Sequence, residues 1–315
     1  MKTKILIADK FPDQYIEELK GMDLDVENSP KLVADDLPSA AKDKEVLIVR
    51  STKVTADTIN SSENLKLIIR AGAGVNNIDI PAATEKNIAV CNCPGKNSVA
   101  VAELAVGLMV SLDRRIPDNV SDFNNGKWNK AKYSKAEGLK GKTLGIVGVG
   151  NIGREVAVRA NAFGMTVYGQ DIYQQEGMPL KYYDKIPEML PQCDVISVHL
   201  PANEQTKGLF NKEMFNYLKP GSFFINTSRP AVIDENAMLD AIKEKNIMVA
   251  LDVFNDEPEG KTGEVSSKLQ NNPNIYITHH IGASTNEAQN AVATEAIRIV
   301  SNYVNSGKFE NQVNK

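Results

Sequence analysis

The stretch LGIVGVGNIG, residues 144–153, decides the fold of this chain. Its first part, Leu144–Val147, is an apolar run typical of a buried strand, and a helical pattern begins near Arg154. The glycines between them have the G-x-G-x-x-G spacing of a dinucleotide-binding turn, in which the backbone approaches a pyrophosphate at a helix N-terminus. A glycine turn without a ligand is the alternative, but the strand before it and the helix after it favour a binding site. The predicted contacts are Gly148, Gly150, Asn151, Ile152 and Gly153.

An acidic residue follows at the position that such a site requires. Asp171 ends the next predicted strand, 18 residues beyond Gly153. Its carboxylate would accept hydrogen bonds from the adenosine ribose and repel a 2′-phosphate. No arginine follows in Ile172-Tyr173 to relieve that repulsion. The sequence therefore predicts NAD rather than NADP as cofactor.

Short apolar runs alternate with helical patterns along the whole chain, which is typical of parallel sheets with crossover helices. The second half holds six such runs: Leu144–Val147, Thr166–Tyr168, Val195–Val198, Phe223–Ile225, Val249–Leu251 and Ile275–Thr278. The first half holds four: Ile5–Ala8, Val46–Val49, Leu67–Ile69 and Ala89–Cys91. We expect an α/β protein with two doubly wound parallel-sheet domains.

The segments between the runs are of three kinds. Asn97 to Ile116 is apolar on most of its surface, which predicts a helix buried on several sides between the domains, with Pro117 to end or bend it. Residues 124–142 are rich in Gly, Asn and Lys and predict an exposed loop. A helical pattern after Ser284 runs to the end, and periodicity alone does not decide which domain it covers.

Composition excludes several classes of protein. Among 315 residues there are 36 basic and 40 acidic side chains, a net charge of −4, which argues against nucleic-acid binding and against a membrane partner. Three cysteines, at 91, 93 and 193, give no disulfide framework and no zinc spacing, so no metal is expected. The N-terminus lacks the pattern of a signal peptide, and we expect a cytoplasmic protein.

Histidines and other polar residues gather at the carboxyl ends of predicted strands, where open α/β sheets bind their ligands. The chain has three histidines, His199, His279 and His280, and each lies at such an end. Residues 226–229 and Asp252 have the same position on their own strands. A single histidine is more often structural, but three at one edge indicate that at least one is an acid/base group.

Two further charged residues are candidates for the same chemistry. Glu257 could orient a histidine and favour its charged form, and Arg229 could bind a carboxylate with its planar guanidinium. A solvated loop charge and a surface ion pair are the alternatives for them. The turn at residues 72–77 lacks a third glycine, and its N–H groups could instead meet a small anion.

These motifs, in this order, resemble the D-isomer-specific 2-hydroxyacid dehydrogenases, and the similarity covers essentially the whole chain. The motifs are GxGxxG, residues 199–201 (HLP), 226–229 (NTSR), 252–258 (DVFNDEP) and 280–285 (HIGAST). The resemblance implies that Arg229 binds the substrate carboxylate, Glu257 pairs with the histidine and His280 is the acid/base, so that the catalytic residues are Arg229, Glu257 and His280.

The resemblance also implies the division of the chain. Residues 1–97 and the C-terminal helix 284–315 would form a smaller, flavodoxin-like substrate domain, and residues 98–283 an inserted Rossmann-type NAD domain. The implied cofactor contacts are Gly148, Gly150, Asn151, Ile152, Gly153, Asp171, His199, Leu200, Pro201, Thr227, Ser228, Arg229, Asp252, His280 and Gly282. The implied substrate contacts are Arg50, Arg70, Gly74, Val75, Asn97, Arg229 and His280.

Within the family, the stretches 49–55 and 70–79 are most similar to the phosphoglycerate dehydrogenase branch. Arg50 and Arg70 end predicted strands and would suit a phosphorylated 2-hydroxy acid, although ordinary ion pairs are the alternative. The implied activity is NAD-dependent oxidation of D-3-phosphoglycerate to 3-phosphohydroxypyruvate, the entry to serine biosynthesis, in a homodimer without the regulatory domain of longer relatives. Reduction of hydroxypyruvate, glyoxylate or another 2-keto acid is one alternative. A non-catalytic NAD-sensing protein is the other.

The chain departs from the family pattern at two positions. Pro230 stands where the family has glycine; it lacks an N–H and biases Arg229 away from helical backbone. His279 stands where proline is usual, which raises the question of which histidine titrates. Successive side chains of an extended segment point in opposite directions, and we therefore expect only His280 to face the site.

Overall fold

The computed structural model describes residues 2–258 and 262–314, which form two compact units. Unit 1 consists of the chain up to Asn97 together with the segment from Ser284 onward, and unit 2 is Ser98–Ala283. Each unit is an α/β domain built on its own parallel sheet, and the predicted fold class is confirmed. In these described residues, no helix is long and apolar enough to cross a membrane.

Unit 1 is built on a five-stranded parallel sheet in the order β2-β1-β3-β4-β5, the flavodoxin-like order. The strands are β1 (Lys4–Ile7), β2 (Asp25–Asn28), β3 (Val46–Val49), β4 (Leu67–Arg70) and β5 (Ala89–Asn92). Near the C-terminus the chain returns to β5, where Gln312 forms an antiparallel bridge with Cys91. The side chain of Asn314 bonds there to the backbone of Ile88 and Val90.

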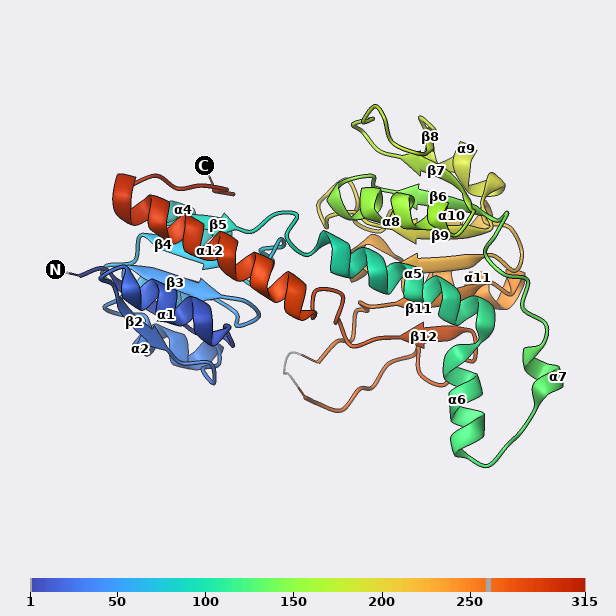
Figure 1. Ribbon diagram of the computed structural model, residues 1–315, viewed down its shortest axis with the longest axis horizontal. Helices are drawn as coiled ribbons and strands as arrows, with labels where there is room; N and C mark the ends of the chain where they lie inside the picture. The colour runs from blue at the N-terminus through green and yellow to red at the C-terminus, as the bar shows by residue number, and fades with distance from the viewer. Residues whose placement is uncertain (1, 259–261, 315) are drawn as a thin grey trace. The chain divides into compact units, whose positions relative to one another are not determined.

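Helices cover both faces of this sheet (Figure 1). On one face α1 (Asp13–Gly21) and α12 (Asn286–Ser306) pack on apolar side chains of β1, β3 and β4. On the other face lie α2 (Leu37–Ala40), α3 (Ala56–Ser61) and α4 (Ile80–Glu85). The C-terminal helix is thus part of the core of unit 1.

Unit 2 is built on a seven-stranded parallel sheet in the order β12-β11-β10-β9-β6-β7-β8. The strands are β6 (Thr143–Val147), β7 (Thr166–Gln170), β8 (Lys181–Tyr182), β9 (Val195–Val198), β10 (Phe223–Asn226), β11 (Met248–Leu251) and β12 (Ile275–Ile277). The chain order reverses between β6 and β9, and such a switch point is where doubly wound sheets bind ligands. The glycine turn after β6 lies at that point.

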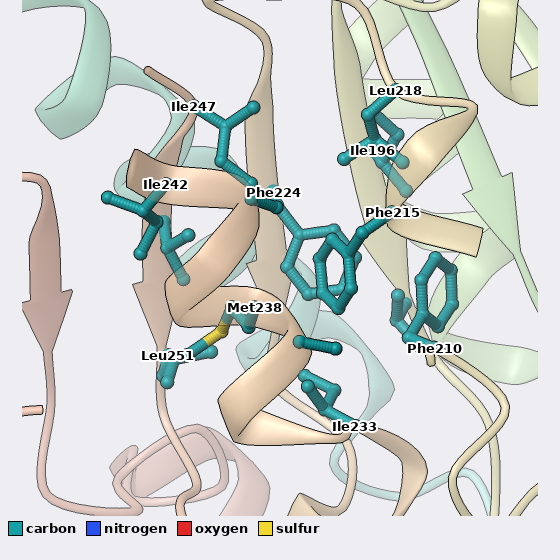
Figure 2. Close-up of a cluster of buried hydrophobic side chains, with 14 of the residues drawn as sticks. Ile196, Phe210, Phe215, Leu218, Phe224, Ile233, Met238, Ile242, Ile247 and Leu251 are labelled. Carbon is teal, nitrogen blue, oxygen red and sulfur yellow. The ribbon is translucent and has the colours of Figure 1, made fainter. Parts of the chain in front are cut away.

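Two cores hold the helices of unit 2 to its sheet. On one face α5 (Ser98–Arg114) and α8 (Asn151–Ala162) pack together over β6, β10 and β11. On the other face are α9 (Ile186–Met189), α10 (Lys212–Asn216) and α11 (Glu235–Lys245), which contribute apolar side chains to one core cluster. Figure 2 shows part of this cluster, in which the rings of Phe210, Phe215 and Phe224 pack together.

The structure differs from the sequence prediction in several segments. The strands β2 and β8 were not predicted, because DVEN is polar at a sheet edge and β8 has only two residues. Residue Arg115, in a left-handed conformation, ends α5, and Pro117 lies in the first turn of a new helix, α6 (Ile116–Asn124). A short helix, α7 (Lys130–Tyr133), interrupts the predicted loop. The apolar helix expected over residues 97–116 is α5, which is buried in the core of unit 2.

Candidate active site

The glycine turn after β6 has the geometry that close approach of a ligand requires. Gly148 has φ +91°, and a Cβ on it would lie 2.6 Å from the carbonyl oxygen of His199. A Cβ on Gly153 would lie 2.2 Å from the carbonyl oxygen of Gly148, so α8 packs against the turn as only glycine permits. At Gly150 a Cβ would meet nothing within 4 Å. A methyl group at this position would thus meet open space beside the first turn of α8, where the N–H groups of a helix have no partner within the helix.

Asp171 follows β7 directly and contacts this turn. Its carboxylate accepts hydrogen bonds from the N–H of Val149 at 2.6 Å and of Tyr173 at 3.0 Å. The acidic residue thus lies beside the turn, where a ribose would follow a pyrophosphate. The open glycine turn, the start of α8 and this carboxylate fit a dinucleotide such as NAD.

Arg154 is a residue of this region that the sequence analysis did not select. Its guanidinium lies at the first turn of α8, where Nε donates to the carbonyl oxygen of Gly150 at 3.2 Å. It also bonds to the side chains of Asn151 and Gln175. A half-buried arginine held across a helix N-terminus adds positive charge at the predicted pyrophosphate position. The sequence feature that could have identified Arg154 is its position directly after Gly153, the last glycine of the motif.

His199 comes after β9, but its imidazole is not an acid/base at neutral pH. Burial lowers the pKa of His199 to about 3, and its Nε2 lies 2.8 Å from Ser197 Oγ. The ring is therefore neutral. Its backbone, with Leu200, forms the wall against which Gly148 packs. Pro201 follows as an exposed residue, and cofactor contacts by residues 199–201 stay predictions.

The turn after β10 is fixed by one buried amide. Asn226 Oδ1 accepts hydrogen bonds from the N–H and the hydroxyl of Ser228, at 3.0 and 2.6 Å. Its Nδ2 donates to the carbonyl oxygen of Arg229 at 3.0 Å. Thr227 is buried between these residues, with a hydroxyl that has no hydrogen-bond partner among the described residues. The side chain of Asn226 thus fixes the backbone conformation of the turn that carries Arg229.

Arg229 is a half-buried cation in extended backbone. Its φ and ψ are −140° and 139°, which agrees with the bias expected before Pro230. Nη1 donates to the carbonyl oxygen of Ser228 at 2.6 Å. Burial lowers the pKa of Arg229 from its ordinary value, while the charge of Glu257 acts in the opposite direction. A guanidinium partly stripped of water favours a carboxylate ligand.

His280 and Glu257 form a direct pair. The distance from His280 Nδ1 to Glu257 Oε2 is 2.8 Å. The other carboxylate oxygen of Glu257 accepts the N–H of Phe254 at 2.9 Å, which fixes the side chain toward the histidine. The hydrogen bond from Glu257 raises the pKa of His280 above its ordinary value, and burial opposes this. The pairing of Glu257 with His280 that the resemblance implies is thus present, and the acid/base role of this pair stays a prediction.

The backbone at His280 differs from the extended segment that we expected. His280 has φ +51°, a left-handed conformation uncommon for a side chain of this size. Orientation of the two histidines therefore does not follow from strand alternation. Both histidines are exposed, so the choice between them rests on the contact of His280 with Glu257.

Asp252 holds this left-handed turn. Its carboxylate is 1% exposed and accepts hydrogen bonds from the N–H of Ile281 at 2.9 Å and of Gly282 at 2.8 Å. The hydroxyl of Thr278 donates to it at 2.6 Å. A Cβ on Gly282 would lie 3.0 Å from the same carboxylate, so glycine keeps the turn close. The side chain of Asp252 is thus used inside the protein, and contacts of Asp252 and Gly282 with NAD stay predictions.

In unit 1 the two predicted arginines lie at the carboxyl ends of neighbouring strands. Arg70 ends β4 in register with Val49, and Arg50 follows Val49. Burial lowers the pKa of Arg50 from its ordinary value. The guanidinium of Arg70 occupies the space over Gly72, where a Cβ would lie 1.6 Å from Nη1. Two half-buried cations are thus carried by adjacent strands.

A buried carboxylate orders the segment that carries Arg50. Asp9 is 3% exposed, and its Oδ2 accepts the N–H groups of Arg50, Ser51 and Thr52 at 2.8 to 2.9 Å. Sequence reasoning did not select Asp9, although its place directly after the run Ile5–Ala8 was a signal.

The remaining predicted substrate contacts also lie in unit 1. Gly74 and Val75 belong to the half-buried loop after β4, and Asn97 is the last residue before α5. Nothing in the described ranges brings three or more His, Cys, Asp or Glu side chains together in an arrangement that could hold a metal ion.

The chain is similar in sequence to known proteins. Residues 106–282 match the NAD binding domain of the D-isomer specific 2-hydroxyacid dehydrogenase family. The chain is 39% identical to D-3-phosphoglycerate dehydrogenase of Methanocaldococcus jannaschii over 99% of its own length and 59% of that protein. It is 41% identical to hydroxypyruvate reductase of Thermotoga maritima, over 85% of its length and 88% of that protein.

Solved structures of this family are also similar to the chain in fold. The NAD⁺-bound 3-phosphoglycerate dehydrogenase of Entamoeba histolytica superposes with a TM-score of 0.84 at 30% identity, over 100% of this chain and 99% of that one. The chain spans about three fifths of the Methanocaldococcus relative. The cofactor of the present chain is NAD, and the chain belongs to the D-isomer specific 2-hydroxyacid dehydrogenase family.

Proposed function

We propose that this chain oxidises D-3-phosphoglycerate to 3-phosphohydroxypyruvate with NAD, with His280 as the acid/base. The observation that carries the proposal is the 2.8 Å contact between His280 Nδ1 and Glu257 Oε2, next to the partly desolvated Arg229. An NAD-sensing protein without turnover has no use for such a pair. The bound NAD supplies the chemistry of accepting a hydride from the alcohol carbon.

The protein's own residues carry the proton. The carboxylate of Glu257 only accepts hydrogen bonds, so Nδ1 of His280 donates to it, and neutral His280 has its lone pair on Nε2. Nε2 takes the hydroxyl proton as the C–O bond becomes a double bond, and the imidazolium that forms is stabilised by Glu257. In the reverse direction the same nitrogen returns the proton. Oxidation therefore requires neutral His280, and reduction requires the charged form.

The guanidinium of Arg229 would hold the substrate carboxylate. Its backbone is fixed by Asn226, so the guanidinium is presented with little freedom to lose. A planar donor pair matches a carboxylate in a bidentate way. The N–H groups near Gly74 and Val75 are proposed as further donors to the same group.

A phosphate group would be held by Arg50 and Arg70. Their adjacent strand ends, partial burial and positive charge suit a dianion better than a neutral group. Relatives named D-3-phosphoglycerate dehydrogenase support the same substrate class. We infer from these two lines that the substrate is phosphorylated.

Reduction of hydroxypyruvate is a second candidate function. The Thermotoga hydroxypyruvate reductase matches this chain over 88% of its own length, whereas the Methanocaldococcus phosphoglycerate dehydrogenase matches it over 59%. It would use the same Arg229, Glu257 and His280, because hydroxypyruvate has the same 2-keto acid group. The two candidates differ only in the need for Arg50 and Arg70.

Replacing these arginines separates the candidates. In Arg50→Met and Arg70→Met we expect KM for 3-phosphohydroxypyruvate to rise about tenfold to a hundredfold, because each removes a charge-assisted contact. KM for hydroxypyruvate should change little, and this substrate is the internal control. Arg229→Met should impair both substrates. Equal losses for both substrates in the Arg50 and Arg70 variants would contradict the phosphate role.

A further inference from the structure

Glu235 is a buried carboxylate for which the proposed chemistry has no direct use. It is the first residue of α11, and its side chain is 5% exposed. The N-cap of this helix is already provided by Asp234, which accepts the N–H groups of Asn236 and Ala237. A carboxylate is costly to bury unless it is paired or hydrogen-bonded, so Glu235 needs another reason for its position.

Its hydrogen bond goes to the segment that carries Glu257. Glu235 Oε1 accepts the N–H of Asn255 at 2.8 Å, and Lys268 Nζ lies 3.6 Å from Oε2. Asn255 is two residues before Glu257. Between β11 and Asn255 the chain is held by Phe254, which is 6% exposed and packs in the core with α11. Glu235 thus binds the backbone of this segment two residues before Glu257.

The helix that carries Glu235 is anchored in the core of unit 2. Met238 and Ile242 of α11 lie in the apolar cluster with Phe224 and Leu251 (Figure 2). A carboxylate on a helix that is packed in the core can hold a loop in a fixed position by binding one of its backbone N–H groups. Loops without such contacts are the parts of a protein that open most easily.

We propose that Glu235 is a positioning residue for the acid/base pair: by binding the N–H of Asn255 it holds segment 253–257 so that Glu257 faces His280. The expected effect on turnover rests on the proposed function, whereas the hydrogen bond between Glu235 and Asn255 does not depend on it. A second readout, the titration of His280, needs no activity. The charged groups around His280 are Glu257, Asp252 and Arg229, and Glu257 makes the largest contribution to its raised pKa.

The test is Glu235→Ala in the full chain, with the imidazole of His280 followed by NMR as a function of pH. The chain has three histidines, and replacing His279 or His199 assigns the signals. We expect the pKa of His280 to fall toward the value in Glu257→Gln. We also expect kcat/KM to fall about tenfold to a hundredfold, as for other small misplacements of catalytic groups. The pH below which oxidation stops should shift downward.

Three matched variants make the result specific. Glu235→Gln keeps an oxygen that can accept the N–H of Asn255 and should restore the pKa and the rate. Lys268→Met removes the ion pair but not the acceptor and should resemble the wild type. Asp113→Ala removes another buried carboxylate of unit 2, one that accepts the N–H of Gly138 at 2.9 Å, and should lower stability alone. If Glu235→Ala does not fold, Glu235→Asp, one methylene shorter, takes its place.

Several results would overturn the proposal. It fails if Glu235→Ala folds with an unchanged pKa of His280, or if Lys268→Met or Asp113→Ala lowers that pKa equally. Failure of the proposed function is recognised separately. In that case Glu257→Gln leaves the pKa of His280 unchanged, or no 2-keto acid is turned over, whatever residue is present at position 235.

Discussion

His280 occupies a left-handed backbone position, and this explains why several of its neighbours are hydrogen-bonded to one carboxylate. The φ of +51° is unfavourable for histidine, and Asp252 offsets the strain through the N–H groups of Ile281 and Gly282. The turn directs the ring to Glu257. The position of His280 is therefore set by Asp252, and its hydrogen bond and raised pKa are set by Glu257.

Replacing His280 with asparagine tests its role with little disturbance of the backbone. Asparagine tolerates the left-handed conformation better than most residues, so the turn should persist. We expect kcat to fall about a hundredfold to ten-thousandfold, the usual contribution of a general acid/base. NADH binding, measured by fluorescence, should be retained. The matched variant His279→Ala should keep turnover, and the reverse pattern would assign the acid/base to His279.

Some residues of the candidate site could be selected from the sequence, whereas the structural roles of others became visible only in the structure. Arg229, Glu257 and His280 could be predicted because each belongs to a motif with a chemical reason. The tasks of Asp9, Asp252 and Glu235 could not, because they bind backbone N–H groups that are distant in sequence. Such contacts depend on the register of neighbouring strands and loops, which no local pattern shows.

The element that joins β6 to α8 gives a matched pair of glycines. In Gly150→Ala the new methyl group meets no protein atom, so thermal stability should be unchanged while NADH binding weakens. In Gly153→Ala the methyl group meets the carbonyl oxygen of Gly148, and unfolding should become easier by about 1–3 kcal/mol. Thermal unfolding and a fluorescence titration with NADH check both. Undiminished binding by Gly150→Ala would place the cofactor elsewhere.

A second element, α12, carries a buried charge that makes unit 1 sensitive to acid. Glu295 is 7% exposed and binds Arg298 at 2.7 Å, Asn311 at 2.8 Å and Lys96 at 3.4 Å. The hydrogen bond from Arg298 lowers the pKa of Glu295 to about 2. A folded pKa below the ordinary value of 4.5 means that this carboxylate stabilises the fold above about pH 4.5.

We therefore expect the contribution of Glu295 to disappear as pH falls from about 4.5 to about 2. Glu295→Gln should lower the free energy of unfolding by about 1.5–3 kcal/mol near neutral pH, the usual value of hydrogen bonds to a charged group. The difference between variant and wild type should shrink in acid. Urea unfolding at several pH values measures it, and a difference independent of pH would contradict the linkage.

For the whole molecule, the alternating apolar runs were sufficient to predict two parallel sheets. The runs recover ten of the twelve strands of the described residues, because strands buried on both faces are continuously apolar. The edge strands β2 and β8 were missed because an edge needs no apolar run. The helix α6 was missed because Pro117, interpreted as a stop, is equally suited to the first turn of a helix.

The oligomeric state stays a prediction. Ile116, Val120 and Phe123 are exposed along α6, and Trp128 follows with 82% of its surface exposed. A group of large apolar side chains in water is typical of surfaces that other proteins cover. The expected homodimer is consistent with these side chains, and the molar mass in solution, measured by light scattering, distinguishes it from a monomer.

The most direct test of the proposed function is NADH consumption by the purified protein. It is measured with 3-phosphohydroxypyruvate, hydroxypyruvate, glyoxylate and pyruvate, and repeated with NADPH. We predict a clear preference for the phosphorylated keto acid and for NADH. Because the raised pKa of His280 keeps it charged to higher pH, reduction should fall as pH rises and oxidation should increase. Preference for an unphosphorylated acid would contradict the substrate, and binding of NADH without turnover of any of these acids would contradict the enzyme.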